Sequence, residues 1–281
     1  MININGNLVE DKNATISVFN RGLAYGDSVF ETLRVINGKI IFWEDHYFRL
    51  MSSMRIMRME IPANFSPEFL EEEILLLLKA NGLIDSPARI RFTVFRKHGG
   101  YYRPNTLDIE YIITSETLSD PFYLLNEGPY EVELFKDYYV TSGLLSTIKS
   151  NNRAINVLGS IFAKENDYQN CLLINENKQV VEALNGNIFL VNGDKIKTPP
   201  LKDGALNGIS RKQIISVVGR MMDLEIEETS ISPFELQKAD ELFISNVIVG
   251  IQPISKYRKK EYNNKVAKEV LSKLNVKARL G

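Results

Sequence analysis

The sequence predicts an α+β protein of two domains. The chain has 281 residues, which suits one large domain or two of ordinary size. Helix patterns and strand patterns are mixed in both halves, and a polar stretch containing Ser119, Asp120, Pro121 and Gly128 separates them. We therefore expect a small N-terminal domain over residues 1–118, a linker over 119–128 and a larger C-terminal domain over 129–281.

The first half predicts strands and helices separated by tight turns. A strand, an Asn-Gly turn and a second strand are expected in "ETLRVINGKIIFWE", and "EDHYFRLMSSMRIMR" has helical spacing. A second helix is expected to begin with Ser66 as N-cap and Pro67 in the first turn, and to stop at Asn81-Gly82. "ARIRFTVF" and "DIEYIITSE" alternate as half-buried strands do.

The second half predicts the same mixture. Ser232, Pro233 and Glu235 have the pattern of a capped helix start. We expect two hairpins in "CLLINENKQVVEA" and "NIFLVNGDKIKTPP", further strands in "YEVELFKDYYV", "LEIEETSI" and "DELFISNVIVGIQPI", and helices in "INVLGSIFAKEND", "SRKQIISVVGRMM" and "NKVAKEVLSKLNV".

Composition excludes several classes of protein. The net charge of −1 implies no broad attraction to nucleic acid or to a membrane surface. The N-terminus has no signal-peptide pattern, and the longest apolar run, near "ILLLLKA", is too short to span a bilayer, so we expect a cytoplasmic protein. Cys171 is the only cysteine, which suits a buried hydrophobe. With His46 and His98 as the only histidines, neither a His-rich metal site nor a Ser-His-Asp triad is expected.

Four stretches combine unusual polar residues with a tight backbone. They are "NRGLAYGDSVFETLRV" (20–35), "LLSTIKSNNRAI" (144–155) with Lys149, "VVEALNG" with Glu182, and "ALNGISRKQII" (205–215). The last is a turn leading into a helix, whose free N–H groups and dipole favour an anion. Ser210 is placed there as a cap and an extra donor.

Each of these stretches also has an ordinary structural interpretation. Most lysines are solvated surface residues, and a turn such as "NGIS" is usually only a helix cap. Glu182 is more often a residue that faces solvent from an edge strand. Together, an anion-binding helix start, a lysine near apolar residues and an acid in a strand suit pyridoxal phosphate, but composition alone does not bring them together.

At these residues the chain resembles the class IV, fold-type IV pyridoxal-phosphate enzymes over nearly its whole length. That family holds branched-chain aminotransferases, D-amino-acid aminotransferases and 4-amino-4-deoxychorismate lyases. The blocks that carry the resemblance occur in the family's order: "NRGLAYGDSVFETLRV", "EDHYFRL", "IKSNNR", "LLINENKQVVEALNGNIFLV", "TPPLKDGALNGISRKQII" and "ADELFISNVIVGIQPI". The implied fold is a small α/β N-terminal domain and a larger C-terminal pseudo-barrel domain, in a homodimer.

The resemblance implies a role for each matched residue. Lys149 is expected to hold pyridoxal 5'-phosphate as a Schiff base and then to move protons as the catalytic base. Glu182 is expected to pair with the pyridine nitrogen, and Arg49 to bind the phosphate bidentately. Further cofactor contacts are expected from Asn187, Gly208, Ile209, Ser210 and Asn246. The substrate pocket is expected to include Tyr25, Thr32, Arg96 and His98, although His98 is equally well explained as an ordinary loop histidine in a Gly-rich turn.

Two departures from the family pattern bear on the reaction. Ala154 stands where branched-chain aminotransferases usually have a Tyr, and Val247 stands where they have a phosphate-binding Thr. The preferred interpretation is an aminotransferase that moves an amino group between an amino acid and a 2-oxo acid. The alternative is an aminodeoxychorismate lyase that releases pyruvate and p-aminobenzoate, with Thr32 and Asn152 as residues that tune the choice. A cofactor-free binding scaffold is the remote third possibility.

Overall fold

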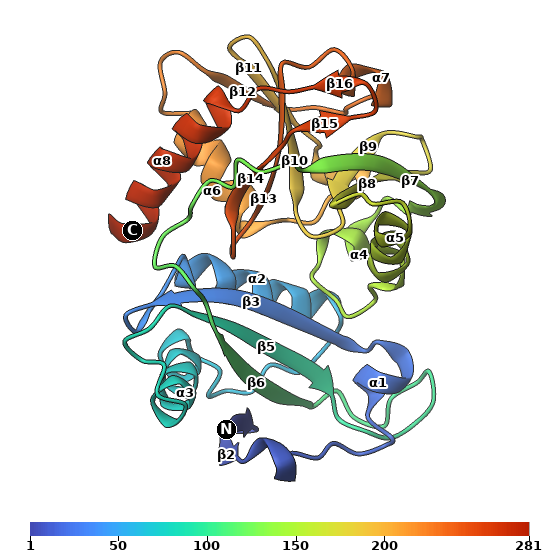
Figure 1. Cartoon of the computed structure of the whole chain (residues 1–281). Coiled ribbons are helices and arrows are strands. Elements are labelled where there is room, and N and C mark those ends of the chain that lie inside the picture. Colours follow the sequence, from blue (N-terminus) through green and yellow to red (C-terminus); the bar gives the residue numbers. More distant parts are fainter. Residues whose placement is uncertain (281) are drawn as a thin grey trace. The chain divides into compact units, whose positions relative to one another are not determined.

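The computed structural model describes residues 1–280, which form two compact units (Figure 1). The first unit comprises Met1–Pro121 together with Ile148–Asn152, and the second comprises Phe122–Thr147 and Arg153–Leu280. The first break falls within the expected linker, but Ile148–Asn152, expected in the C-terminal domain, belongs to the first unit. Gly281, the last residue of that expected domain, lies outside the described residues.

The first unit is built on an antiparallel sheet in the strand order β2-β1-β6-β5-β3-β4. The β1–β2 hairpin turns at Asn5 and Gly6, which both have positive φ, as a tight hairpin turn requires. The strands are β1 (Ile2–Ile4), β2 (Asn7–Val9), β3 (Ser28–Ile36), β4 (Lys39–Ile40), β5 (Ala88–Arg96) and β6 (Ile109–Thr117).

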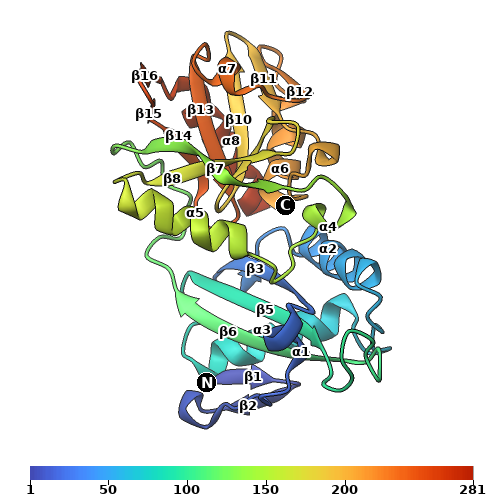
Figure 2. The same cartoon turned by 90° about the vertical axis from the view of Figure 1, so that its right-hand side faces the viewer.

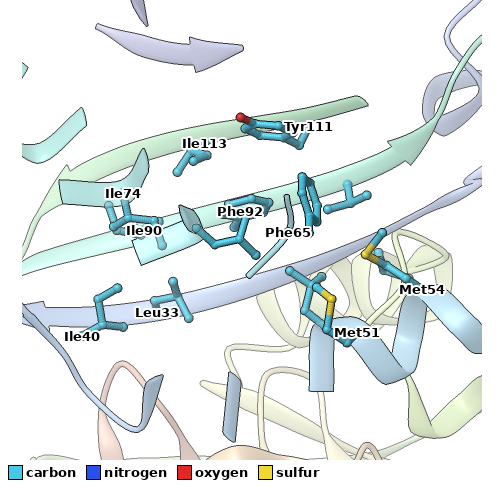
Figure 3. Packing of buried hydrophobic residues seen from close by; sticks show 14 of the residues in the cluster. Leu33, Ile40, Met51, Met54, Phe65, Ile74, Ile90, Phe92, Tyr111 and Ile113 are labelled. Carbon is cyan, nitrogen blue, oxygen red and sulfur yellow. The ribbon is translucent and has the colours of Figure 1, made fainter. Parts of the chain in front are cut away.

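Two long helices of this unit, α2 (Trp43–Ile56) and α3 (Pro67–Ala80), share one hydrophobic core with the sheet. Figure 3 shows Leu33 of β3, Phe92 of β5 and Met51 of α2 in that core. As predicted, the Ser66 side chain caps α3 by accepting from the Phe69 N–H at 3.2 Å. The short elements α1 (Arg21–Tyr25) and η1 (Asp11–Asn13) precede β3.

The segment Ile148–Asn152 is tied to β3 by its backbone. The Phe30 N–H donates to the Lys149 carbonyl at 2.8 Å, and the Asn151 N–H donates to the Ser28 carbonyl at 3.0 Å. Ile148 lies in the hydrophobic core of the unit. The backbone of Lys149 and of the two residues after it is therefore held by β3.

The second unit contains two five-stranded sheets, ordered β12-β11-β10-β13-β14 and β16-β15-β7-β8-β9. Their facing strands share a core that includes Leu134, Leu172, Leu190 and Leu242. Figure 2 shows β7 and β8 running across β10 and β13. The strands are β7 (Glu131–Val140), β8 (Asn170–Asn175), β9 (Val180–Ala183), β10 (Asn187–Asn192), β11 (Lys195–Thr198), β12 (Glu225–Glu228), β13 (Glu241–Asn246), β14 (Gly250–Ile254), β15 (Lys256–Tyr257) and β16 (Lys260–Glu261).

Helices cover this pair of sheets. The predicted cap at Ser232 is confirmed, because α7 (Pro233–Leu236) begins with a reciprocal capping box between Ser232 and Glu235. The other helical elements are α4 (Leu144–Thr147), α5 (Ala154–Glu165), η2 (Leu201–Asp203), α6 (Ile209–Val218) and α8 (Lys265–Leu280). None of the helices in residues 1–280 combines the length and apolar character needed to cross a membrane.

Candidate active site

Lys149 lies beside an aromatic ring of β3 in the first unit. Its Nζ is 4.7 Å from the centroid of the Phe30 ring, a cation–π distance. Phe30 is only 8% exposed, and Lys149 is half-buried. An amine in such partly apolar surroundings is suited to carbonyl chemistry.

Arg91 brings a second cation to the same ring. Its guanidinium carbon is 3.8 Å from the centroid of Phe30, and its Nη2 donates to Asn151 Oδ1 at 3.0 Å. Thr32, which is 8% exposed, stands directly opposite Arg91 in the β3–β5 register. Sequence reasoning missed Arg91. The sequence shows two arginines at alternate positions of "ARIRFTVF", so both are expected on one face of a strand. Alternation does not show which other residues pack against that face.

Glu31 is a buried carboxylate on the core face of β3, and α2 supplies its partners. Its Oε1 accepts from Arg49 Nε at 2.8 Å, and its Oε2 accepts from Arg49 Nη2 at 2.5 Å. Burial alone would raise the pKa of Glu31, but the charge of Arg49 and the hydrogen bonds from Arg49 and His46 lower the pKa to about 2. The Nε and Nη2 atoms of Arg49 therefore bind Glu31, and the phosphate contact expected from the sequence stays a prediction.

His46 completes this cluster. Its Nδ1 lies 2.6 Å from Glu31 Oε2, and the side chain is fully buried. Burial lowers the pKa of His46 below its ordinary value of 6.5, although Glu31 opposes the change. The imidazole is therefore neutral at pH 7, and Nδ1 carries the proton because an ionised carboxylate only accepts.

A second buried ion cluster surrounds Asp27. Arg21 Nε and Arg96 Nε each donate to Asp27 Oδ2 at 2.9 Å. The remaining Arg96 donors bind Asp27 Oδ1 and the carbonyls of Met57 and Arg58, so its guanidinium holds the end of β5 in place.

The other residues expected in the substrate pocket have different surroundings. His98 is exposed in the loop after β5, and Tyr25, 38% exposed, forms a tilted ring pair with Tyr102. Of the expected substrate residues, Thr32 is the one whose paired residue, Arg91, contacts the same ring as Lys149.

In the second unit, Glu182 is buried although its strand, β9, is the edge of its sheet. The residue is 6% exposed, and its Oε2 accepts from the Leu206 N–H at 2.9 Å. The Leu206 carbonyl in turn accepts from Asn187 Nδ2 at 2.9 Å. Glu182 and Asn187 thus bind the backbone N–H and the backbone carbonyl of Leu206, which lies two residues before the N-cap of α6.

The start of α6 has the features of an anion site. Gly208 is the N-cap, and a Cβ on it would lie 1.9 Å from Asn187 Oδ1, so only glycine lets this turn approach Asn187. Ser210, in the first turn, is 2% exposed, and within residues 1–280 its buried Oγ has no hydrogen-bond partner. Ile209 and Ser210 add first-turn N–H groups that a helix cannot satisfy internally.

Asn246 closes the turn between β13 and β14. Its Oδ1 accepts from the N–H groups of Ile248 and Val249, both at 3.0 Å, and its Nδ2 donates to the Asn185 carbonyl at 3.1 Å. The side chain therefore shapes the turn in which Val247 stands.

Comparison with known proteins identifies the family. The sequence profile of amino-transferase class IV matches residues 28–257. This chain belongs to the class IV aminotransferase family. A putative branched-chain-amino-acid aminotransferase of Methanocaldococcus jannaschii is 30% identical over 276 residues, covering 98% of this chain and 94% of that protein. A D-alanine aminotransferase of Listeria monocytogenes is 28% identical over 256 residues, covering 90% of this chain and 86% of that protein.

Solved structures show the same fold for this class IV enzyme. The branched-chain aminotransferase of Thermoproteus uzoniensis, solved with norvaline, superposes with a TM-score of 0.87 at 24% identity, covering 97% of this chain and 92% of that one. A putative 4-amino-4-deoxychorismate lyase of Legionella pneumophila gives a TM-score of 0.86 at 21% identity, covering 96% and 98%. The fold-type IV architecture predicted from the sequence is therefore confirmed. Because both kinds of protein share it, the fold does not distinguish a transaminase from a lyase.

The residues of this class IV aminotransferase fit pyridoxal phosphate, on which its family depends. In the second unit, a buried carboxylate and a helix start with an unpartnered hydroxyl are joined through Leu206. These match a ring nitrogen and a phosphate, the two polar ends of the cofactor.

Proposed function

We propose that this chain is a pyridoxal-phosphate-dependent aminotransferase that moves an amino group between an amino acid and a 2-oxo acid. The observation that carries the proposal is that the Leu206 backbone binds Glu182 through its N–H and Asn187 through its carbonyl, two residues before the N-cap of α6. A carboxylate and an anion-binding turn that are connected through the backbone of one residue suit a ligand with a basic nitrogen and a phosphate.

Each residue of the second unit has a defined task in this proposal. The bound cofactor supplies an electron sink that makes the substrate's Cα proton acidic. Glu182 keeps the ring nitrogen protonated, and its own burial is offset by that pairing. The phosphate is bound by Ser210 Oγ and by the N–H groups of Ile209 and Ser210. Asn187 and Gly208 shape the turn before α6, and Asn246 shapes the turn between β13 and β14.

The first unit supplies the reacting amine. Lys149 would hold the cofactor through Nζ and would move a proton at the substrate's Cα. Arg91 and Thr32 receive a carboxylate of the substrate near the Phe30 ring. Arg49, whose Nε and Nη2 bind Glu31, is the residue of this unit that we propose for the phosphate. By resemblance to the family we also propose a cytoplasmic homodimer.

The proposal is tested by the visible spectrum of the purified protein with added cofactor. We expect an absorption band that is lost in Lys149→Ala and kept in a matched control, Lys202→Ala, at an exposed position on η2. The band should bleach with at least one member of a panel of L- and D-amino acids, and that member names the amino donor. A band that ignores every amino acid, together with pyruvate release from aminodeoxychorismate, would replace the transaminase with the lyase.

A further inference from the structure

We propose that Asn151 is a positioning residue that sets the guanidinium of Arg91 for a carboxylate of the substrate. The inference rests on the proposed function and extends it to a residue that neither the sequence patterns nor the family comparison single out. Asn151 follows Lys149 by two residues, in the segment that the first unit ties to β3.

Asn151 links three parts of the first unit. Its backbone N–H donates to the Ser28 carbonyl at 3.0 Å, which fixes the residue to β3. Its side-chain Oδ1 accepts from Arg91 Nη2 at 3.0 Å, which reaches β5. Since residue 149 is held on the same strand by the Phe30 N–H at 2.8 Å, any shift of Asn151 is coupled to the lysine's own backbone.

Two contacts together define the orientation of the Arg91 guanidinium. The cation–π contact with the Phe30 ring, at 3.8 Å from the guanidinium carbon to the centroid, restrains the position of the group. The hydrogen bond from Nη2 to Asn151 Oδ1 restrains the direction in which the group points. A guanidinium binds a carboxylate bidentately only in one orientation. If that orientation is fixed before binding, the long arginine side chain loses less conformational entropy when the carboxylate binds.

The charge pattern indicates why an anion binds there. The Arg91 guanidinium and the Lys149 ammonium both contact the Phe30 ring, at 3.8 and 4.7 Å from its centroid. Two cations around one ring make the electrostatic potential there positive, which favours an anion. Amino acids and 2-oxo acids both carry a carboxylate, so one cation centre serves both half-reactions of a transaminase.

The test is a double-mutant cycle on the holoenzyme with Asn151→Leu, Arg91→Leu and the double variant. Leucine has nearly the shape of asparagine but no acceptor. We expect Asn151→Leu to raise the KM for the amino donor about tenfold, the effect of losing one hydrogen bond to a charged group. The kcat and the visible band should stay near wild type, and Asn151→Leu should add little in the Arg91→Leu background.

A matched control comes from the same face of β5. Arg89 lies two residues before Arg91 and pairs with Glu116 at 2.9 Å, so Arg89→Leu should leave the KM unchanged. Glutamate and norvaline as donors show which carboxylate is bound. If Asn151→Leu and Arg91→Leu raise the KM of both donors, Arg91 binds the α-carboxylate that the two donors share. If the variants raise only the KM of glutamate, Arg91 binds the side-chain carboxylate of glutamate.

Two results would overturn the inference: additive effects of Asn151→Leu and Arg91→Leu, or a fall in kcat with an unchanged KM. A wild-type protein that shows no visible band or no turnover would instead overturn the proposed function. That failure is seen before any variant is compared.

Discussion

Glu31→Gln should destabilise the first unit far more than the loss of an ordinary buried carboxylate. Glu31 is 2% exposed, accepts from Arg49 at 2.8 and 2.5 Å and lies 2.6 Å from His46 Nδ1. The amide of glutamine has one acceptor and one donor. Whichever way it is turned, its NH2 group meets an N–H of Arg49 or of His46, and the Arg49 charge loses its counter-ion.

The expected loss of stability follows from the pKa of Glu31 and from the known cost of breaking buried ion pairs. The pKa of Glu31 is lowered from 4.5 to about 2. At about 1.36 kcal/mol for each pH unit, the ionised carboxylate contributes about 3 kcal/mol to folding at pH 7. Removing one partner of a buried ion pair costs about 3–5 kcal/mol, which agrees. We therefore expect Glu31→Gln to lower the free energy of unfolding by about 3 kcal/mol.

The stability difference between wild type and Glu31→Gln should depend on pH in a definite direction. A carboxylate whose pKa is depressed by folding stabilises the protein above its unfolded pKa, and that contribution is lost as the pH falls through the folded value. The difference between wild type and Glu31→Gln should be constant at neutral pH and shrink between pH 4.5 and about 2. At pH 3 it should be about 1 kcal/mol.

Urea unfolding of the apoprotein at pH 7 and pH 3 measures these differences. The matched control is Glu73→Gln, also buried in the first unit but bound by the neutral donors Asn3 Nδ2 at 2.7 Å and Tyr111 OH at 3.1 Å. It should cost about 1 kcal/mol. Equal losses in the two variants, or a Glu31→Gln loss that does not shrink in acid, would refute the reasoning.

Three further substitutions test the local geometry. Gly26→Ala should destabilise the protein by about 1 kcal/mol or more in urea unfolding, because Gly26 has a φ of 63° and a Cβ there would lie 2.2 Å from Asn152 Oδ1. Gly208→Ala should weaken cofactor binding about tenfold in a spectral titration, since a Cβ there displaces Asn187, and unchanged affinity would contradict this role. Ser232→Ala should lower stability by about 1 kcal/mol without affecting cofactor affinity, and a larger effect on affinity than on stability would contradict the cap assignment.

Elements with strong local signals were predictable from the sequence. The Ser66 and Ser232 caps form as expected because each interaction lies within one helical turn. The helix α1 was not predicted, because it has only five residues and depends on Asn20, whose side chain accepts from the Leu23 N–H. Residues Ile148–Asn152 lie in the range expected for the C-terminal domain yet pair with β3, because chain order does not show which sheet a short segment joins.

The chemistry of the candidate site was predictable only in part. Resemblance singled out Lys149 and Glu182, and burial of the Glu182 carboxylate agrees with a paired charge. It could not show that Glu31 holds the fork of Arg49, because that contact joins a strand to a helix eighteen residues away. The contact between Arg91 and Asn151 spans sixty residues and has no sequence signature.

Lys149 is the residue that we propose carries the cofactor. The most direct measurement is borohydride reduction of the cofactor-loaded protein, followed by proteolysis and mass spectrometry of the peptides. We expect a phosphopyridoxyl group on the peptide containing Lys149 and on no other. Modification of a different lysine, or none after loading with cofactor, would contradict it.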